Sequence, residues 1–156
     1  MTARVAFDAL TSRGWMLATA ESCTGGLIAG AITDLAGSSA VFDRGFVTYS
    51  NAAKTQMLGV PDTLIKLHGA VSEQVAGAMA QGALATSDAS IAVSVTGIAG
   101  PGGSDHKPEG RVCFGIATDG TVHTETKEFG PIGRENVRVA TVNHALSLVA
   151  QVAEPE

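Results

Sequence analysis

A serine and a lysine in this sequence could together carry out nucleophilic catalysis. Ser22 lies in the segment AESCTGG, and Lys54 ends the segment YSNAAK, which begins at Tyr49. A serine hydroxyl becomes a nucleophile when a base removes its proton, and a lysine can be that base once desolvation or a neighbouring cation lowers its pKa. We therefore predict Ser22 as the nucleophile, Lys54 as its base and Tyr49 as a residue that relays or orients the proton.

Each of these residues also fits a purely structural role. The segment around Ser22 would suit a capped helix start, an aromatic residue at a strand end usually packs, and an isolated lysine on a helix is usually solvated. Cys23 is a rival nucleophile, but no histidine with an obvious role adjoins it, and a buried thiol is more often inert. On composition and spacing alone, the structural role is favoured for each of these residues.

The connection from residue 21 to 26 should join a buried strand to a helix. Backbone N–H groups at the positive end of a helix dipole stabilise a developing oxyanion or a phosphate. We therefore predict that this connection binds substrate through Thr24, Gly25 and Gly26.

A second glycine-rich segment follows the most apolar predicted strand. Its sequence, VTGIAGPGG from Val95 to Gly103, lacks the lysine of a P-loop and the spacing of a dinucleotide-binding motif. Its glycines still expose backbone donors, and Thr96 should stand at the end of the strand. The substrate-binding residues predicted here are Thr96, Gly97, Ala99, Gly100 and Gly102.

Two arginines near the C-terminus could grip a phosphate. Arg134 and Arg138 are spaced so that they share one face of a helix. Surface arginines in ion pairs would look the same. The four histidines show no common metal-ligand spacing, so no metal and no cofactor are predicted. The histidines are His68, His106, His123 and His144.

Composition excludes several classes of protein. The 156 residues are 45% hydrophobic and 16% charged, which excludes disorder driven by charge. No apolar run is long enough to span a bilayer, so no membrane partner is expected. The net charge of −5 and the absence of a Lys/Arg cluster argue against a nucleic-acid partner.

Length and cysteine content fit one intracellular domain. We expect a single domain over residues 1–156. The segment from Met1 to Leu10 lacks the apolar stretch and cleavage site of a signal peptide, which favours the cytoplasm. Cys23 and Cys113 are too few and too isolated for a zinc site or a disulfide framework.

Hydrophobic periodicity and turn residues predict alternating helices and strands. Strands are expected over 15–20, 45–49, 90–95, 111–118 and 122–129, the last two joined by an Asp119-Gly120 hairpin turn. Helices are expected up to about residue 14 and over 27–35, 50–58, 72–85 and 133–152, with a short helical piece near 64–67. The stretch 96–110 should be a functional loop.

This order predicts an α/β fold, a three-layer α/β/α sandwich with a mixed, mostly parallel sheet of about five strands. Its ligand crevice should lie beyond the C-terminal ends of the parallel strands. The Ala/Gly-rich helix from Ser72 to Thr86 offers a surface for close packing and would suit a homo-oligomer.

Six segments, in order and at matching intervals, resemble the C-terminal domain family of the competence- and damage-inducible protein CinA. The resemblance covers nearly the whole chain and rests on the motifs AESCTGG, YSNAAK, HGAVSE, VTGIAGPGG, KP and GRENVR. It implies hydrolysis of nicotinamide mononucleotide to nicotinic acid mononucleotide and ammonia, within pyridine-nucleotide recycling. By motif it assigns the nucleophile to Ser22 and the base to Lys54, together with Tyr49. It favours Arg134 as the arginine at the site.

Two departures from the family pattern leave other functions open. Ser104 and Asp105 stand where the family usually has glycine and threonine, and Glu109 replaces the valine of its Lys-Pro-Val-Gly motif. Added carboxylates near an anionic substrate would weaken its binding. The alternatives are a catalytically silent nucleotide-binding regulatory module and an amidase for a different amide.

Overall fold

The computed structural model describes residues 2–104 and 106–155. Asp105 lies outside the described residues. The helices are α1 (Thr2–Arg13), α2 (Leu27–Thr33), α3 (Asn51–Leu58), α4 (Asp62–His68), α5 (Glu73–Ala85) and α6 (Arg134–Ala153), with a 3-10 turn η1 (Ser38–Ala40). The strands are β1 (Leu17–Glu21), β2 (Phe42–Val47), β3 (Ile91–Gly97), β4 (Arg111–Thr118) and β5 (Thr121–Glu128).

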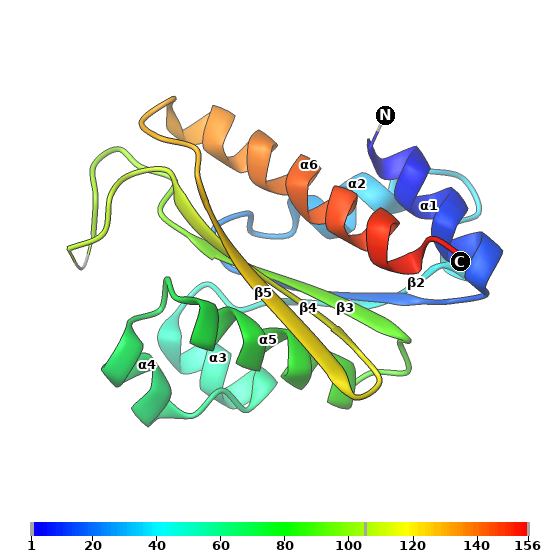
Figure 1. Cartoon of the computed structure of the whole chain (residues 1–156), viewed down its shortest axis with the longest axis horizontal. Coiled ribbons are helices and arrows are strands. Elements are labelled where there is room, and N and C mark those ends of the chain that lie inside the picture. Colours follow the sequence, from blue (N-terminus) through cyan, green and yellow to red (C-terminus); the bar gives the residue numbers. More distant parts are fainter. Residues whose placement is uncertain (1, 105, 156) are drawn as a thin grey trace.

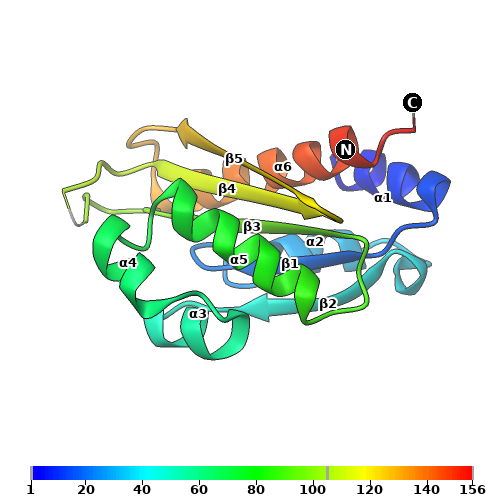
Figure 2. The ribbon, with the colours of Figure 1, turned by 60° about the horizontal axis from the view of Figure 1, so that its bottom comes forward.

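The five strands form one mixed sheet in the order β2-β1-β3-β4-β5. Strands β2, β1 and β3 pair in parallel, whereas β4 is antiparallel to both β3 and β5. Only β4 therefore runs against the common direction (Figure 2). The predicted mixed sheet, the central position of β3 and the hairpin between β4 and β5 are confirmed.

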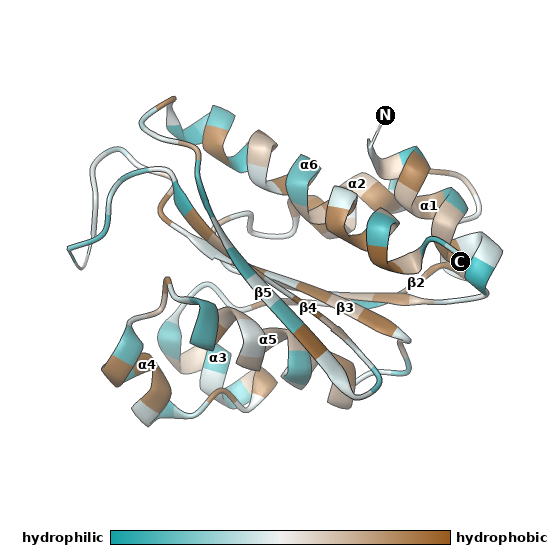
Figure 3. Cartoon of the chain, in the orientation of Figure 1, coloured by the Kyte–Doolittle hydropathy of each residue, from teal (hydrophilic) through white to brown (hydrophobic). Residues whose placement is uncertain are grey.

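Helices cover both faces of the sheet, as the predicted sandwich requires. Helices α1, α2 and α6 lie on one face, and α3, α4 and α5 lie on the other (Figure 1). Polar and apolar residues are interspersed along the helices (Figure 3), and most of the buried helix residues are apolar, such as Leu10 of α1 and Val137 and Val149 of α6. Each helical layer therefore buries one apolar stripe against the strands.

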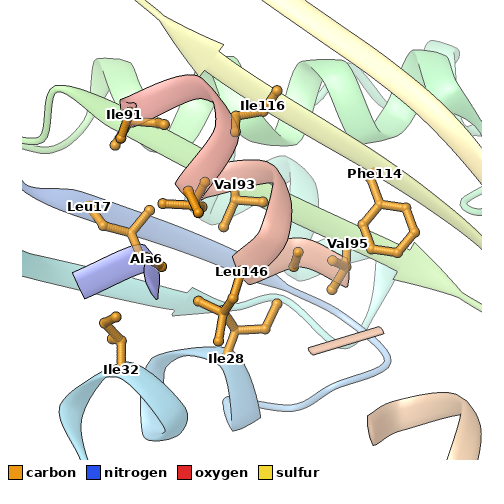
Figure 4. Close-up of a cluster of buried hydrophobic side chains, with 14 of the residues drawn as sticks. Ala6, Leu17, Ile28, Ile32, Ile91, Val93, Val95, Phe114, Ile116 and Leu146 are labelled. Atoms are coloured by element: carbon orange, nitrogen blue, oxygen red, sulfur yellow. The ribbon is translucent and has the colours of Figure 1, made fainter. Parts of the chain in front are cut away.

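Two hydrophobic clusters hold the layers together, one on each face of the sheet. Alternate residues of a strand point to opposite faces. Leu17 and Val93 accordingly join the cluster under α1, α2 and α6 (Figure 4), while Ala18 and Ala92 join the cluster over α5. Strands β1 and β3 are thus buried on both faces, which fixes the positions of the loops that follow them.

Strands β1, β2, β3 and β5 begin or end one to three residues from the predicted positions, and the ends of β2 and β3 have a clear cause. Strand β2 ends at Val47, although aromatic and β-branched residues predicted a strand up to residue 49. The Thr48 N–H still donates to the Glu21 carbonyl at 2.8 Å, after which Ser50 caps α3 and turns the chain away. Strand β3 continues to Gly97 because it pairs with β4 up to Val112, so the functional loop starts at residue 98.

The small residues of α5 pack inside the chain rather than on a free surface. A Cβ at Gly77 would contact the Thr124 and Val122 side chains of β5, and Ala76 and Ala80 are fully buried. The close-packing surface that suggested a homo-oligomer is therefore used within the chain, and the oligomer itself stays a prediction. No helix in residues 2–104 and 106–155 is long and apolar enough to cross a membrane.

Gly82 should be intolerant of any side chain, because a Cβ there would lie 2.0 Å from the Leu58 carbonyl oxygen at the end of α3. We expect Gly82→Ala to destabilise the protein by about 1–3 kcal/mol through overpacking. Gly30, in α2, has no atom within 4 Å of its added Cβ, so Gly30→Ala is the matched control. It should stabilise by roughly 0.5–1 kcal/mol through helix propensity. Urea unfolding of both variants tests this, and equal midpoints would contradict it.

Candidate active site

A cavity of about 380 Å³ opens at the C-terminal ends of β1, β2 and β3. Its lining comes from the three segments that follow these strands, completed by Ala70, Val71, Lys107 and Arg134. This is the edge of the sheet at which the sequence predicted a ligand crevice. The connections after β1 and β2 leave toward opposite faces of the sheet, so the cavity lies where the chain changes direction (Figure 1).

Ser22 and Lys54 meet in this cavity. The Ser22 N–H donates to the Val95 carbonyl at 3.1 Å, which ties the residue after β1 to the neighbouring strand β3. Lys54 lies in α3, whose N-terminus is capped by the Ser50 hydroxyl accepting from Ala53 N–H at 3.0 Å. These two attachments bring Lys54 Nζ to 3.1 Å from Ser22 Oγ. The pair predicted from sequence is thus in hydrogen-bonding contact.

The surroundings of Lys54 favour a neutral amine. Its side chain is 1% exposed, and among the described residues no carboxylate pairs with it. Desolvation by burial is the main cause that lowers the Lys54 pKa from its ordinary value of 10.5. The second contact of Nζ is with the Thr48 carbonyl at 3.0 Å. Because that carbonyl can only accept, it orients Nζ and leaves a lone pair for Ser22.

Cys23 is poorly suited to be the nucleophile. Its side chain is buried, and burial raises the pKa of its thiol to about 11. A thiol with that pKa carries almost no thiolate at neutral pH, and the thiolate is the reactive form. The geometry therefore favours Ser22 over its neighbour.

A buried carboxylate that the sequence analysis did not single out fills the N-terminus of α2. Glu21 is 1% exposed, and its carboxylate accepts from the N–H groups of Ile28 at 2.9 Å and Ala29 at 3.0 Å. It also accepts from Thr24 Oγ1 at 2.5 Å and Gly26 N–H at 3.3 Å. Contrary to expectation, the helix N-terminus is occupied by this internal anion and is not free for a substrate.

The predicted substrate-binding residues of this connection therefore lie outside the cavity. Thr24, Gly25 and Gly26 do not line it, and their substrate-binding role stays a prediction. Gly25 has a φ of +59°, and its N–H donates to the Ser22 carbonyl at 3.0 Å. In the described part of the chain, the Cys23 amide has no acceptor. Because Cys23 follows Ser22 and lines the cavity, its N–H is a donor available for an oxyanion.

The two arginines of α6 have different positions. Arg134 lines the cavity, where its guanidinium donates to the Gly100 carbonyl at 2.7 Å and to Tyr49 Oη at 2.9 Å. Arg138 instead donates to the carbonyls of Cys23 and Thr24, at 3.1 Å and 3.2 Å. Arg134 therefore faces the place of a ligand, while Arg138 holds the loop that carries Ser22.

Tyr49 lies at the mouth of the cavity. It is 59% exposed, and its hydroxyl contacts Arg134. Within the described residues it has no bond to Ser22 or Lys54. Its position suits contact with a ligand better than transfer of the serine proton.

The glycine-rich loop closes another side of the cavity. Gly97, Ala99, Gly100 and Gly102 line it, as predicted. Thr96 also lines it, but its hydroxyl donates to the Ala70 carbonyl at 2.8 Å and so attaches β3 to the segment before α5. Ser104 lies on the same wall.

Like those of Glu21, the contacts of Lys107 could not be predicted from the sequence. Its ammonium donates to the His68 carbonyl at 2.8 Å and to the Val71 carbonyl. The motif KP marked Lys107 in the sequence, but only the folded chain shows which carbonyls it binds. Among the described residues, no group of three or more His, Cys, Asp and Glu side chains could hold a metal ion.

Comparisons with known proteins show the family of this chain. A family model described as the CinA C-terminal domain matches residues 1–153. Nicotinamide-nucleotide amidohydrolase PncC of Enterobacter agglomerans is 59% identical over 133 residues, which cover 84% of this chain and 80% of that protein. A CinA-like protein of Syntrophobacter fumaroxidans is 47% identical over 150 residues, and this chain spans only 35% of that longer relative.

A solved structure extends the likeness to the whole fold. The crystal structure of competence/damage inducible protein CihA from Agrobacterium tumefaciens has a TM-score of 0.93 and 50% sequence identity, covering 98% of this chain and 96% of that chain. The resemblance that six sequence motifs indicated is thereby confirmed. The chain belongs to the CinA C-terminal domain family.

Proposed function

We propose that this chain is a nicotinamide-nucleotide amidase, which hydrolyses nicotinamide mononucleotide to nicotinic acid mononucleotide and ammonia. Two observations support it: the similarity to a protein named nicotinamide-nucleotide amidohydrolase, and the contact between buried Lys54 and Ser22. The contact between Lys54 and Ser22 carries the proposal, because a lysine without an ion-pair partner is rarely buried unless its amine has a function.

The first half of the reaction forms an acyl-enzyme. Neutral Lys54 accepts the Ser22 proton across 3.1 Å, and Ser22 Oγ attacks the carboxamide carbon. The oxyanion of the tetrahedral intermediate accepts a hydrogen bond from the amide of Cys23, which lines the cavity. The Lys54 ammonium then returns its proton to the leaving nitrogen, the C–N bond breaks, and ammonia departs.

The second half releases the acid. Lys54, neutral again, takes a proton from a water molecule, which attacks the ester carbon. Collapse of this second intermediate breaks the bond to Ser22 Oγ and returns the proton to Ser22, so the net reaction consumes one water and forms one carboxylic acid. The Thr48 carbonyl keeps Nζ in the same place during both halves.

The cavity has the size and charge for a mononucleotide. Its volume of about 380 Å³ suits a small ligand, and Arg134 brings a guanidinium to its wall. We assign the substrate phosphate to Arg134, because Arg134 lines the cavity, whereas Arg138 does not line it and binds two carbonyls of the Ser22 loop. The substrate is then a small nucleotide. A cytoplasmic location and a homo-oligomeric state complete the proposal.

Ser22→Ala should abolish ammonia release from nicotinamide mononucleotide while leaving the fold intact. Loss of the nucleophile should reduce kcat by roughly a thousandfold or more. Purified protein treated with a chelator is assayed for ammonia, with circular dichroism as the check of folding. Activity retained by this variant would exclude a serine mechanism. Binding of the nucleotide without ammonia release by the wild type would instead indicate the regulatory module, and release only from other amides would indicate a different amidase.

The Lys54 amine must be neutral to act as the base, so kcat/KM should rise with pH. Because burial lowers the Lys54 pKa, the midpoint of this rise should lie below the ordinary value of 10.5. A pH profile of the wild type measures the midpoint of this rise. A value of kcat/KM that falls as the pH increases from about 6 to about 9 would contradict the assignment of Lys54 as the base.

The same shift predicts that Lys54→Met is inactive but more stable than the wild type. In the folded protein a protonated Lys54 lacks its hydration, and this cost decreases as pH rises through the lowered pKa toward 10.5. The gain in melting temperature should therefore be several degrees at neutral pH and smaller at alkaline pH. Thermal unfolding at both pH values tests this.

Arg134→Met should raise the KM for nicotinamide mononucleotide by roughly ten- to a hundredfold, the range for lost hydrogen bonds to a charged group. The same variant should leave the KM for nicotinamide riboside, which lacks the phosphate, nearly unchanged. Arg138→Met should instead lower kcat and the unfolding midpoint, because it releases the Ser22 loop. An equal change in KM for both substrates in Arg134→Met would show that Arg134 does not bind the phosphate.

A further inference from the structure

Glu109 lies behind the glycine-rich loop and holds it from the side away from the cavity. It directly precedes Gly110 and β4, is partly buried, and is absent from the cavity lining. Its Oε1 accepts the N–H of Gly102 at 2.5 Å. A Cβ on Gly100 would lie 2.7 Å from Glu109 Cδ, so the carboxyl group packs directly against the loop backbone.

The loop needs such an attachment to keep its shape. Gly100 and Gly102 have φ values of +95° and +83°. Glycine adopts these values readily, but it adopts many other conformations as readily, so the φ values alone do not fix the loop. Pro101 to Ser104 are exposed, so little packing restrains them. Two backbone bonds between Ser104 and Lys107, at 3.0 Å and 2.8 Å, close the loop beyond Gly103, and the bond from Gly102 N–H to Glu109 restrains the segment before them.

The same loop positions the cavity arginine. The Gly100 carbonyl accepts from Arg134 at 2.7 Å, and Arg134 donates to Tyr49 Oη at 2.9 Å. A continuous series of contacts thus runs from Glu109 through the loop to Arg134 and Tyr49, along one side of the cavity mouth. A shift of the loop would remove the acceptor that orients the guanidinium.

We propose that Glu109 is a positioning residue, which fixes the loop from Gly100 to Gly103 and, through the Gly100 carbonyl, the guanidinium of Arg134 for the substrate phosphate. This inference rests on the proposed amidase function. Glu109 acts as a hydrogen-bond acceptor for Gly102. Its negative charge is not required for this role, because a neutral side-chain oxygen accepts from the same N–H.

Two variants of similar size separate the hydrogen bond from the charge. Glu109→Gln keeps an acceptor oxygen and loses the charge, while Glu109→Met loses both. With nicotinamide mononucleotide, Glu109→Met should raise KM roughly tenfold and change kcat less than about twofold, as expected for one lost charge-assisted bond. Glu109→Gln should restore KM to within about threefold of the wild type, since a neutral acceptor retains most of such a bond. Glu128→Met is the control, since that carboxylate pairs with Arg111 and does not line the cavity.

Hydrogen exchange of the loop supplies a readout that does not need turnover. Amides of residues 98–104 should exchange faster in Glu109→Met than in the wild type or in Glu109→Gln. If the wild type releases no ammonia, the amidase proposal fails. The loop proposal is then judged by this exchange and by the dissociation constant of nicotinamide mononucleotide.

Two results would overturn the positioning role. Unchanged KM and unchanged exchange in Glu109→Met would show that the loop keeps its shape without this bond. A lower KM in both Glu109→Gln and Glu109→Met would show that Glu109 acts by repelling the phosphate through its charge.

Discussion

Removing an ammonium group from water is costly, and the burial of Lys54 is the constraint on which this site depends. The cost is lowest when the amine is neutral, and a neutral amine is what Ser22 needs as its base. The fold supplies this environment through α3, which places Lys54 beneath the end of β1, and through the Thr48 carbonyl, which orients Nζ. Under the proposed mechanism, this local loss of stability is what provides Ser22 with a base.

The surrounding polar groups are mainly used to hold the backbone. Glu21 satisfies the first amides of α2, Arg138 binds two carbonyls of the Ser22 loop, and Lys107 binds two carbonyls before α5. Arg138 and Lys107 join segments that are distant in the sequence, whereas Glu21 binds residues three to eight positions away. Lys107 and Arg134 both line the cavity. Both contacts of the Lys107 ammonium are backbone carbonyls, whereas Arg134 also donates to the exposed hydroxyl of Tyr49.

The fold was predicted well because it follows local patterns: apolar runs located the buried strands, and turn residues located the hairpin between β4 and β5. The contact between Ser22 and Lys54 joins distant segments, so spacing along the chain could not establish it. The family resemblance suggested this pair, and its catalytic role stays a prediction. The role of Glu21 was missed because a carboxylate beside a helix start resembles a solvated one until burial is known. The contacts that distinguish Arg134 from Arg138 are tertiary, and no spacing along α6 contains them.

In the proposed mechanism, the order of the strands also decides when the serine gains its base. Ser22 directly follows β1 and Lys54 lies in the helix after β2, and they meet only once β1 pairs in parallel with β2 and β3. Parallel pairing joins distant segments and is slow compared with helix formation. In the unfolded chain the lysine is hydrated and protonated, so under this mechanism Ser22 has no base until the sheet is complete.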